Sequence, residues 1–332
     1  MDGLIITVIL IVIFALVFDF INGFHDTANA IATSVSTKAL TPRRAILLAA
    51  VMNFVGALTF TGVAKTITSG IADPFELDNG LLVIMAALLA AIIWNLATWY
   101  YGIPSSSSHA IIGAITGAVI VSSGFGAVHF SGFLKIIEAL ILSPIIAFAI
   151  GFIVYAIIKV IFKNQNLTKT NKRFRMMQVL TAAVQSYSHG TNDAQKSMGI
   201  ITMALIVGGM HTSTEVPFWV QLACATAMAA GTSIGGWRII KTVGGKIMKI
   251  RPVNGVAADL TGAAVIFGAT LIHLPVSTTH VISSAILGVG SSHRVKGVNW
   301  GVAKRMVVTW VITLPISALL AAAIYYILHL FF

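Results

Sequence analysis

Long apolar runs, separated by short polar or charged segments, extend along almost the whole chain. A membrane-spanning helix needs about 20 consecutive apolar residues, and the runs predict about ten such spans. Two further segments, 23–37 and 190–203, are too polar to face lipid. We expect them to be re-entrant or broken helices, which are tolerated at membrane depth only inside protein or along a cavity. The predicted spans are 4–22, 45–70, 80–103, 104–124, 134–161, 177–208, 218–237, 255–273, 275–291 and 302–330.

Composition and charge place the chain in a membrane. Of the 332 residues, 57% are hydrophobic and 9% are charged, and the mean hydropathy is +0.94. The net charge of +11 does not indicate nucleic-acid binding, because the basic residues gather in short segments between the apolar runs. The positive-inside rule assigns such segments to the cytoplasm, which puts both termini outside a plasma membrane. The basic segments are 38–44, 159–175, 238–251 and 294–305.

The chain divides into two related halves. The most polar stretch, 163–175, is predicted to be a basic cytoplasmic linker between a first membrane repeat, 1–162, and a second, 176–332. Because five spans precede the linker, the second repeat enters the membrane from the opposite side. We therefore predict an all-α polytopic membrane protein with two inverted repeats of about five spans each and broken or re-entrant helices at the centre. The matched motifs are GFHDTANA from Gly23 with GTNDAQKS from Gly190, and PSSSSHAIIGAITG from Pro104 with PVSTTHVISSAILG from Pro275.

Two aspartates, Asp26 and Asp193, occupy the same place in a repeated Gly-x-x-Asp pattern. Intramembrane charge is costly and usually functional, whereas a carboxylate that only caps a broken helix has little reason to recur at matched positions. Carboxylate and amide oxygens suit Na⁺, and the same carboxylates can carry a proton. For Asp19, Glu138 and Asp259 the pattern favours neither a functional nor a structural role. The predicted coupling-ion residues are Asn22, Asp26, Asn29, Asn192, Asp193, Gln195 and Lys196.

Each half also contains a proline, a run of hydroxyl residues and a histidine that lead into an apolar helix, which is a helix N-terminus signal. Free backbone N–H groups, a positive dipole and hydroxyl donors together bind a tetrahedral oxyanion, although ordinary helix capping explains a single copy. His109 and His280 are candidates for a proton relay, because histidine titrates near a pKa of about 6.5, or are packed histidines. The predicted substrate-binding residues are Ser105, Ser106, Ser107, Ser108, Ser277, Thr278 and Thr279.

The stretches GFHDTANAIATSVST and HGTNDAQKSMGIIT resemble the two signature repeats of the inorganic phosphate transporter (PiT) family, and the compact length is similar to its bacterial members. The resemblance covers nearly the whole chain. It implies an inverted-repeat phosphate symporter, with Asp26, Asn29 and Asp193 binding ions and the two hydroxyl-lined helix ends binding the anion. Gln195 and Lys196 replace the Ala-Asn usual in sodium-coupled relatives. This departure favours proton over sodium coupling and leaves a metal–phosphate ion pair open as the transported species.

Three other functions remain open from the residues alone. A sulfate permease of the same family would use the same donors, but sulfate at neutral pH has no proton for an aspartate to accept. An intramembrane hydrolase would need one activated hydroxyl with His109 or His280 as base, and no hydroxyl is singled out. A passive anion channel would not accumulate its substrate. We expect a transporter and not an enzyme, with phosphate, a coupling H⁺ or Na⁺ and the lipid bilayer as partners. No cofactor and no resident metal are expected, and homo-oligomerisation stays open.

Overall fold

A computed structural model describes residues 2–73 and 79–331, and these residues form helices joined by short connections, as the all-α prediction requires. Every helix of the first half has a counterpart in the second half, in the same order. The first half contains α1 (Asp2–Ser36), α2 (Pro42–Ala57), α3 (Gly62–Gly70), α4 (Gly80–Tyr101), α5 (Ser107–Ser123), the 3-10 helix η1 (Phe125–Ala127) and α6 (Phe130–Ile161). The second contains α7 (Leu167–Val207), α8 (Phe218–Ile234), α9 (Trp237–Gly245), α10 (Pro252–Leu271), α11 (Thr278–Arg294), η2 (Val295–Gly297) and α12 (Trp300–His329).

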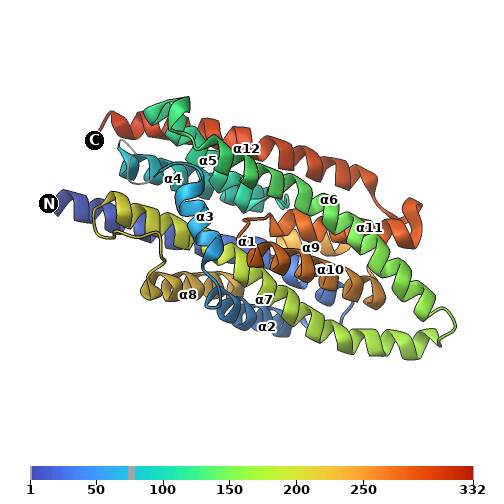
Figure 1. Ribbon diagram of the computed structural model, residues 1–332. Coiled ribbons are helices and arrows are strands. Elements are labelled where there is room, and N and C mark those ends of the chain that lie inside the picture. The colour runs from blue at the N-terminus through green and yellow to red at the C-terminus, as the bar shows by residue number, and fades with distance from the viewer. Residues whose placement is uncertain (1, 74–78, 332) are drawn as a thin grey trace.

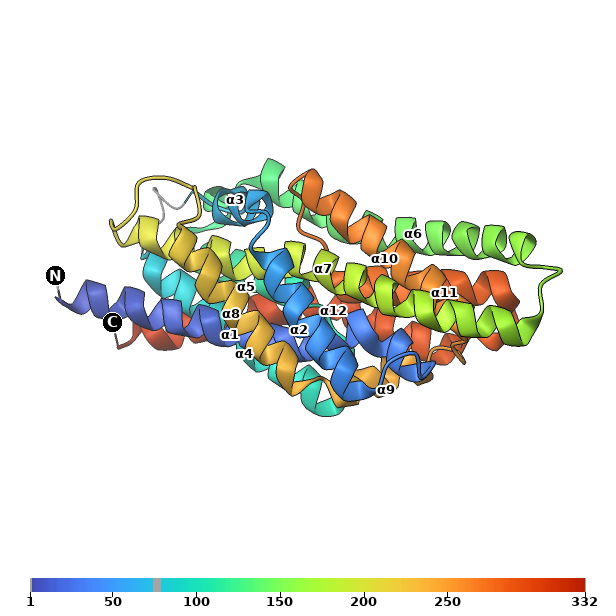
Figure 2. The same cartoon turned by 90° about the horizontal axis from the view of Figure 1, so that it is seen from below.

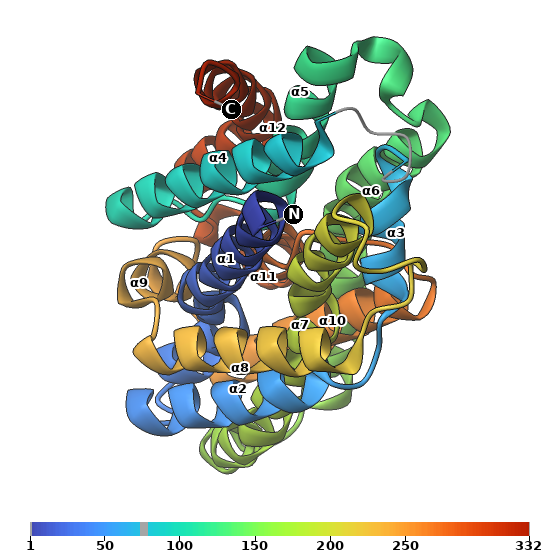
Figure 3. The ribbon, with the colours of Figure 1, turned by 90° about the vertical axis from the view of Figure 1, so that its left-hand side faces the viewer.

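The two halves pack against each other through matched pairs of helices. α1 packs on α8 as α7 packs on α2, and α5 packs on α12 as α11 packs on α6. Within each half, α4 contacts α5 and α1, and α10 contacts α11 and α7. Figure 3 shows α1 and α7 inside the bundle, between α4 on one side and the α2–α8 pair on the other. The duplication seen in the motifs is therefore also a duplication of packing.

The two halves run in opposite directions, which confirms the predicted inverted topology. The two chain ends lie together at one end of the molecule, and the α6–α7 connection lies at the opposite end (Figures 1 and 2). α5 and α11 both begin near the middle of the bundle and run toward opposite ends (Figure 1). Two helix N-termini consequently meet at the centre.

The prediction that 23–37 and 190–203 are re-entrant or broken was wrong. The first segment continues α1 without interruption as far as Ser36, and the second lies wholly within α7. Their polar side chains are buried inside the bundle, where the opposite half supplies hydrogen-bond partners, so an unbroken helix can carry them. The central breaks lie instead between α4 and α5 and between α10 and α11, where a proline interrupts each helix pattern. The predicted span 45–70 is bent by 69° between α2 and α3.

Among the described residues, five helices are long and apolar enough to cross a membrane, namely α1, α4, α6, α10 and α12, and the bent α2–α3 pair makes a sixth if it is one span. α7 is not among them because charged and amide side chains follow its buried face. α6 and α12 are the least buried spans and expose aliphatic residues outward, as lipid-facing helices do. Of the predicted linker 163–175, only the part up to 166 lies outside a helix, because α7 begins at Leu167.

The glycines of the repeated Gly-x-x-Asp pattern lie where helices approach most closely. A Cβ atom at Gly23 would collide with the carbonyl oxygen of Met228 on α8, and one at Gly190 with that of Asn53 on α2. We expect Gly23→Leu to destabilise the fold by about 1–3 kcal/mol through overpacking. Thermal unfolding of the detergent-purified protein measures this loss. The control is Gly268→Leu, where a Cβ would meet nothing within 4 Å, and equal effects of both changes would contradict the close packing.

Candidate substrate and ion site

The two hydroxyl runs lead into two helix N-termini of the same design. α5 begins at Ser107 and α11 at Thr278, and in both the preceding serine is the N-cap. The Ser106 hydroxyl oxygen accepts a bond from the backbone N–H of His109 at 3.1 Å, and that of Ser277 accepts one from His280 at 3.2 Å. The remaining free N–H groups and the positive dipole ends of both helices therefore point to the same central region.

The structure divides the seven predicted substrate-binding hydroxyls into two groups. The hydroxyls of Ser107, Thr278 and Thr279 face the central carboxylates. The other four hold the helix ends in place: Ser106 and Ser277 are caps, Ser105 donates to Thr98 Oγ1 at 2.8 Å, and Ser108 donates to the Val276 carbonyl oxygen at 2.8 Å. The last bond joins the first hydroxyl run to the second.

Asp26 on α1 lies against the helix ends of both repeats. Its Oδ2 accepts a bond from the Ser107 hydroxyl at 2.8 Å, and its Oδ1 accepts one from the Thr279 hydroxyl at 3.0 Å. The same Oδ1 accepts from His25 Nδ1 at 2.8 Å and from Asn29 Nδ2 at 3.3 Å. Asn29 also donates to the Thr279 hydroxyl at 2.7 Å. The carboxylate is 1% exposed, so these donors take the place of water around it.

Asp193 on α7 has a different environment, because it is paired with a cation of the protein itself. Lys196 Nζ donates to Asp193 Oδ1 at 2.6 Å, and both side chains are fully buried. Oδ2 accepts bonds from the Thr278 hydroxyl at 3.1 Å and from Asn22 Nδ2 at 3.4 Å, and His189 Nε2 lies 3.3 Å from it. Lys196 thus supplies an ammonium where the first half has the neutral amide of Asn29.

The two carboxylates are close enough to act as one site. One ligand atom from each of Asp26, His189 and Asp193 lies within 4.8 Å of the others. The side-chain oxygens of Asn22 and Asn29 accept no hydrogen bond from any residue that the structure describes. Carboxylate and amide oxygens in this arrangement are hard ligands for a small cation and acceptors for a proton. The centre therefore combines anion donors from α5 and α11 with cation acceptors from α1 and α7.

Two predicted coupling-ion residues bind the scaffold instead of facing the carboxylates. Asn192 donates to the Leu274 carbonyl oxygen at 3.2 Å and accepts from the Val276 N–H at 3.2 Å. Gln195 accepts from the Ala64 N–H at 3.1 Å. Asn192 therefore holds the α10–α11 connection that positions the second hydroxyl run, and Gln195 holds the start of α3.

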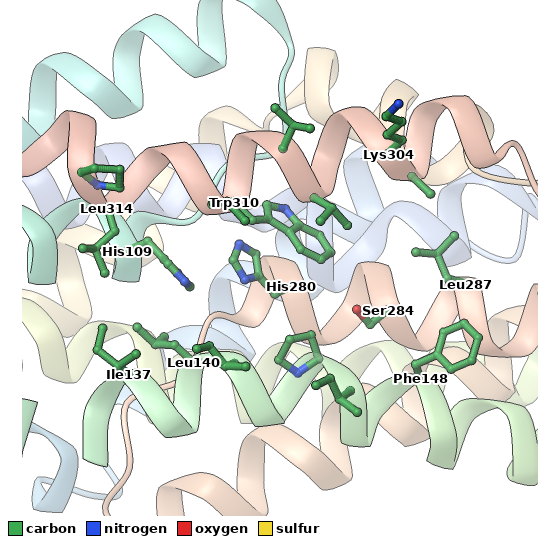
Figure 4. A pocket seen from close by; sticks show the side chains of 18 of the residues that line it. His109, Ile137, Leu140, Phe148, His280, Ser284, Leu287, Lys304, Trp310 and Leu314 are labelled. Atoms are coloured by element: carbon green, nitrogen blue, oxygen red, sulfur yellow. The ribbon is translucent and has the colours of Figure 1, made fainter. Parts of the chain in front are cut away.

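The two predicted relay histidines lie behind the helix ends. The His109 and His280 ring centroids are 4.4 Å apart, and His280 stacks on Trp310 at 4.1 Å. Figure 4 shows both rings at the wall of a cavity of about 1200 Å³, which lies between α6 and α12 and is lined mainly by apolar side chains. Among the described residues, neither ring hydrogen-bonds to Asp26 or Asp193. The structure therefore does not bring the two histidines to the carboxylates.

His189 was absent from the predicted site. Asn22 and His189 each precede the aspartate of their motif by four residues, which is one helical turn, so both side chains lie on the carboxylate face of their helix. In the structure both contact the same oxygen of Asp193. The i, i+4 spacing was the signal that could have identified His189.

Comparisons with known proteins agree with this geometry. The profile of the Phosphate transporter family matches residues 22–173 and again 163–321, which fits two repeats. A probable low-affinity inorganic phosphate transporter of Bacillus subtilis (strain 168) is 77% identical over 100% of both chains. One of Rhizobium meliloti (strain 1021) is 46% identical over 94% of this chain and 93% of that one. A solved structure described as the sodium-dependent phosphate transporter has a TM-score of 0.85 and 27% identity, and covers 98% of this chain and 100% of that one.

Proposed function

The chain belongs to the phosphate transporter family, so it is a multi-pass membrane transporter and not an enzyme, and from this premise we propose that it imports inorganic phosphate by proton symport. The relatives named above are phosphate transporters, which supports the substrate. The basic segments support an orientation with the α6–α7 connection in the cytoplasm and both termini outside.

The observation that carries the proposal is the meeting of two helix N-termini at two carboxylates. Backbone N–H groups and hydroxyls of α5 and α11 are donors for phosphate oxygens, while the nearby Lys196 ammonium is already paired with Asp193. The hydroxyls of Ser107, Thr278 and Thr279 donate to the carboxylates in this structure. When phosphate binds, the same hydroxyls can rotate toward it while the phosphate O–H groups donate to Asp26 or Asp193.

The position of the carboxylates favours phosphate over sulfate. Both aspartates accept bonds from hydroxyls at the N-termini of α5 and α11, so an anion held by these helix ends lies beside buried acceptors. Phosphate carries protons at neutral pH and can satisfy such acceptors, whereas sulfate would leave them unpaired against a negative charge. A sulfate permease with these two helix ends would need a hydrogen-bond donor in place of each aspartate.

Proton coupling is favoured by the asymmetry of the two carboxylates. In the second half the Lys196 ammonium already neutralises Asp193, so a second cation at that carboxylate would face like charge. In the first half Asp26 has no Lys or Arg nitrogen within 4.0 Å among the described residues, and its nearest basic group is His25 at 2.8 Å. Asp26 can carry a proton when the Ser107 hydroxyl, which donates to it here, turns to accept. The solved relative is described as sodium-dependent, so sodium is the second candidate for the coupling ion.

Uptake of labelled phosphate into proteoliposomes tests the proposal. We expect accumulation against the gradient when the outside is acid, no response to an imposed sodium gradient, and competition by arsenate. Sulfate should compete about 10- to 100-fold more weakly, because an unpaired buried acceptor costs about 1–3 kcal/mol. Running the assay with and without Mg²⁺ determines whether a metal–phosphate pair is the cargo. Equal competition by sulfate would refute the choice of phosphate, sodium-driven uptake would refute proton coupling, and equilibration without accumulation would identify a channel.

A further inference from the structure

Besides Asp26 and Asp193, the described residues include two more buried carboxylates, Asp19 on α1 and Asp259 on α10. Asp259 takes no part in the site described above. It is 1% exposed. Its Oδ1 accepts a bond from the Thr33 hydroxyl of α1 at 2.7 Å, and its Oδ2 accepts one from the Thr181 hydroxyl of α7 at 3.0 Å. Thr33 follows Asp26 by seven residues, or two helical turns, on the same face of α1. Asp259 therefore lies on the side of the central site that faces the α1–α2 connection.

Asp259 has no compensating cation. Within the described ranges, no Lys, Arg or His nitrogen lies within 4.0 Å of it, in contrast to Asp193 with Lys196. Neutral hydroxyls alone donate to Asp259 among the described residues. The helices packed against α10 carry other titratable side chains, none of which hydrogen-bonds to it: Asp19, His25 and Asp26 on α1, Tyr187, His189, Asp193 and Lys196 on α7, Tyr155 and Lys159 on α6, His280, His293 and Arg294 on α11, and Lys65 on α3. A buried carboxylate held only by neutral donors is far cheaper to keep when it carries a proton.

A buried amide, Gln185, lies along α7 between Asp259 and the centre. Gln185 of α7 packs against Gly262, three residues after Asp259, where a Cβ would collide with its amide oxygen. Gln185 also precedes His189 by one helical turn, and His189 Nε2 lies 3.3 Å from Asp193. Gln185 is fully buried, and both its amide atoms lack a hydrogen-bond partner among the described residues. A buried amide without a protein partner is a group that ordered water satisfies, and a water on Gln185 would relay a proton between His189 and Asp259.

Further buried polar side chains lie between Asp259 and the α1–α2 connection. Gln178 of α7 packs against Gly255, one turn before Asp259 on α10, and accepts a bond from the Thr37 hydroxyl at 2.5 Å. The amide nitrogens of Gln178 and Asn254 have no partner among the described residues. Thr37 directly follows the last residue of α1. Buried polar side chains therefore occur at intervals between the central site and the α1–α2 connection.

We propose that Asp259 is the inner proton-binding residue of the transport cycle, which takes the coupling proton from the central site along Gln185 and releases it toward the α1–α2 connection. The step is an acid–base exchange. Asp259 becomes a neutral carboxylic acid when it takes up the proton that leaves the centre, and it becomes a carboxylate again when it releases that proton. This inference rests on the proposed proton symport and deepens it. It assigns binding of phosphate to the centre and release of the proton to α10.

The test compares two transport modes of Asp259→Asn in proteoliposomes. Exchange of labelled for unlabelled phosphate at equal pH needs no net proton movement, whereas uptake driven by an acid exterior does. We expect Asp259→Asn to keep phosphate exchange while net proton-driven uptake falls at least about tenfold, with a matching loss of proton entry measured by a trapped pH-sensitive dye. Asp259→Glu should keep both modes. The matched control is Glu138→Gln, which changes an exposed carboxylate on α6 and should keep both modes as well.

The outcomes separate this inference from the proposed function. Net proton-driven uptake by Asp259→Asn at the wild-type rate would overturn the inference alone. A parallel loss of exchange and net uptake in Asp259→Asn, with normal function in Asp259→Glu, would also overturn it, because Asp259 would then serve phosphate binding. Wild-type vesicles that exchange phosphate but respond only to sodium would overturn both the inference and the proton symport.

Discussion

Asp26→Asn is expected to abolish phosphate uptake while the protein still folds. The carboxylate is the common acceptor for Ser107, Thr279, His25 and Asn29, and it joins the helix ends of both repeats. The amide has nearly the same shape but presents donors to a shell of donors and cannot take up a proton. Loss of a charged acceptor of this kind costs about 3 kcal/mol or more, which corresponds to at least about a 100-fold loss of initial uptake rate. The measurement is labelled phosphate uptake, normalised to the amount of reconstituted protein.

Asp26→Glu and Glu138→Gln serve as controls for this prediction. Asp26→Glu keeps the charge but moves it by one methylene, so we expect partial activity. Glu138 is exposed on α6, and its amide should leave uptake intact. If Asp26→Asn kept more than about a tenth of wild-type uptake, a loss of under about 1.4 kcal/mol, the carboxylate would not be the central acceptor.

Lys196→Asn is expected to make uptake depend on sodium. Removal of the ammonium leaves Asp193 buried without its partner, and breaking such a pair costs about 3–5 kcal/mol. The change also places in the second half the amide that Asn29 provides in the first. The oxygens of Asp193 and Asn22 then form a site that Na⁺ can neutralise. We expect uptake by Lys196→Asn to fall about 100-fold in potassium or choline buffer and to recover in sodium buffer. Wild-type uptake should be the same in all three buffers.

The stability of the purified protein provides an independent measurement. Sodium should raise the unfolding temperature of Lys196→Asn but not that of the wild type, because a ligand stabilises only the state that binds it. Lys196→Arg keeps the positive charge and should remain independent of sodium. Wild-type uptake that already requires sodium, or a Lys196→Asn variant that is active without it, would contradict the assignment of Lys196 as a built-in cation.

Much of the architecture followed from local patterns in the chain. Apolar runs of span length indicated helices in a membrane, and the polar stretch near 163–175 together with the repeated motifs indicated two inverted halves. The helix starts at Ser107 and Thr278 also lay where the proline and hydroxyl runs placed them. These features were accessible because propensity, capping and hydrophobicity depend on residues only a few positions apart.

The assignment of broken helices at 23–37 and 190–203 failed for a related reason. Polarity alone cannot distinguish a segment that breaks from one that stays helical in the interior, since both avoid lipid. α1 and α7 stay helical because each buries its polar face against the other half. The partner that made an unbroken helix possible lay in a distant part of the sequence.

The sequence by itself determined the membrane class, the duplication, the two carboxylate motifs and the two helix N-termini, because each can be read from the order of residues along the chain without knowing which helices pack together. Only the tertiary structure decided which of these residues meet. It placed the hydroxyl of Thr279 on Asp26, 253 residues away, turned Ser105, Ser108 and Asn192 to the scaffold, and set His109 and His280 apart from the carboxylates. The physical reason is that a side chain's direction on its own helix is a local property, whereas its partner is chosen by the packing of two inverted halves.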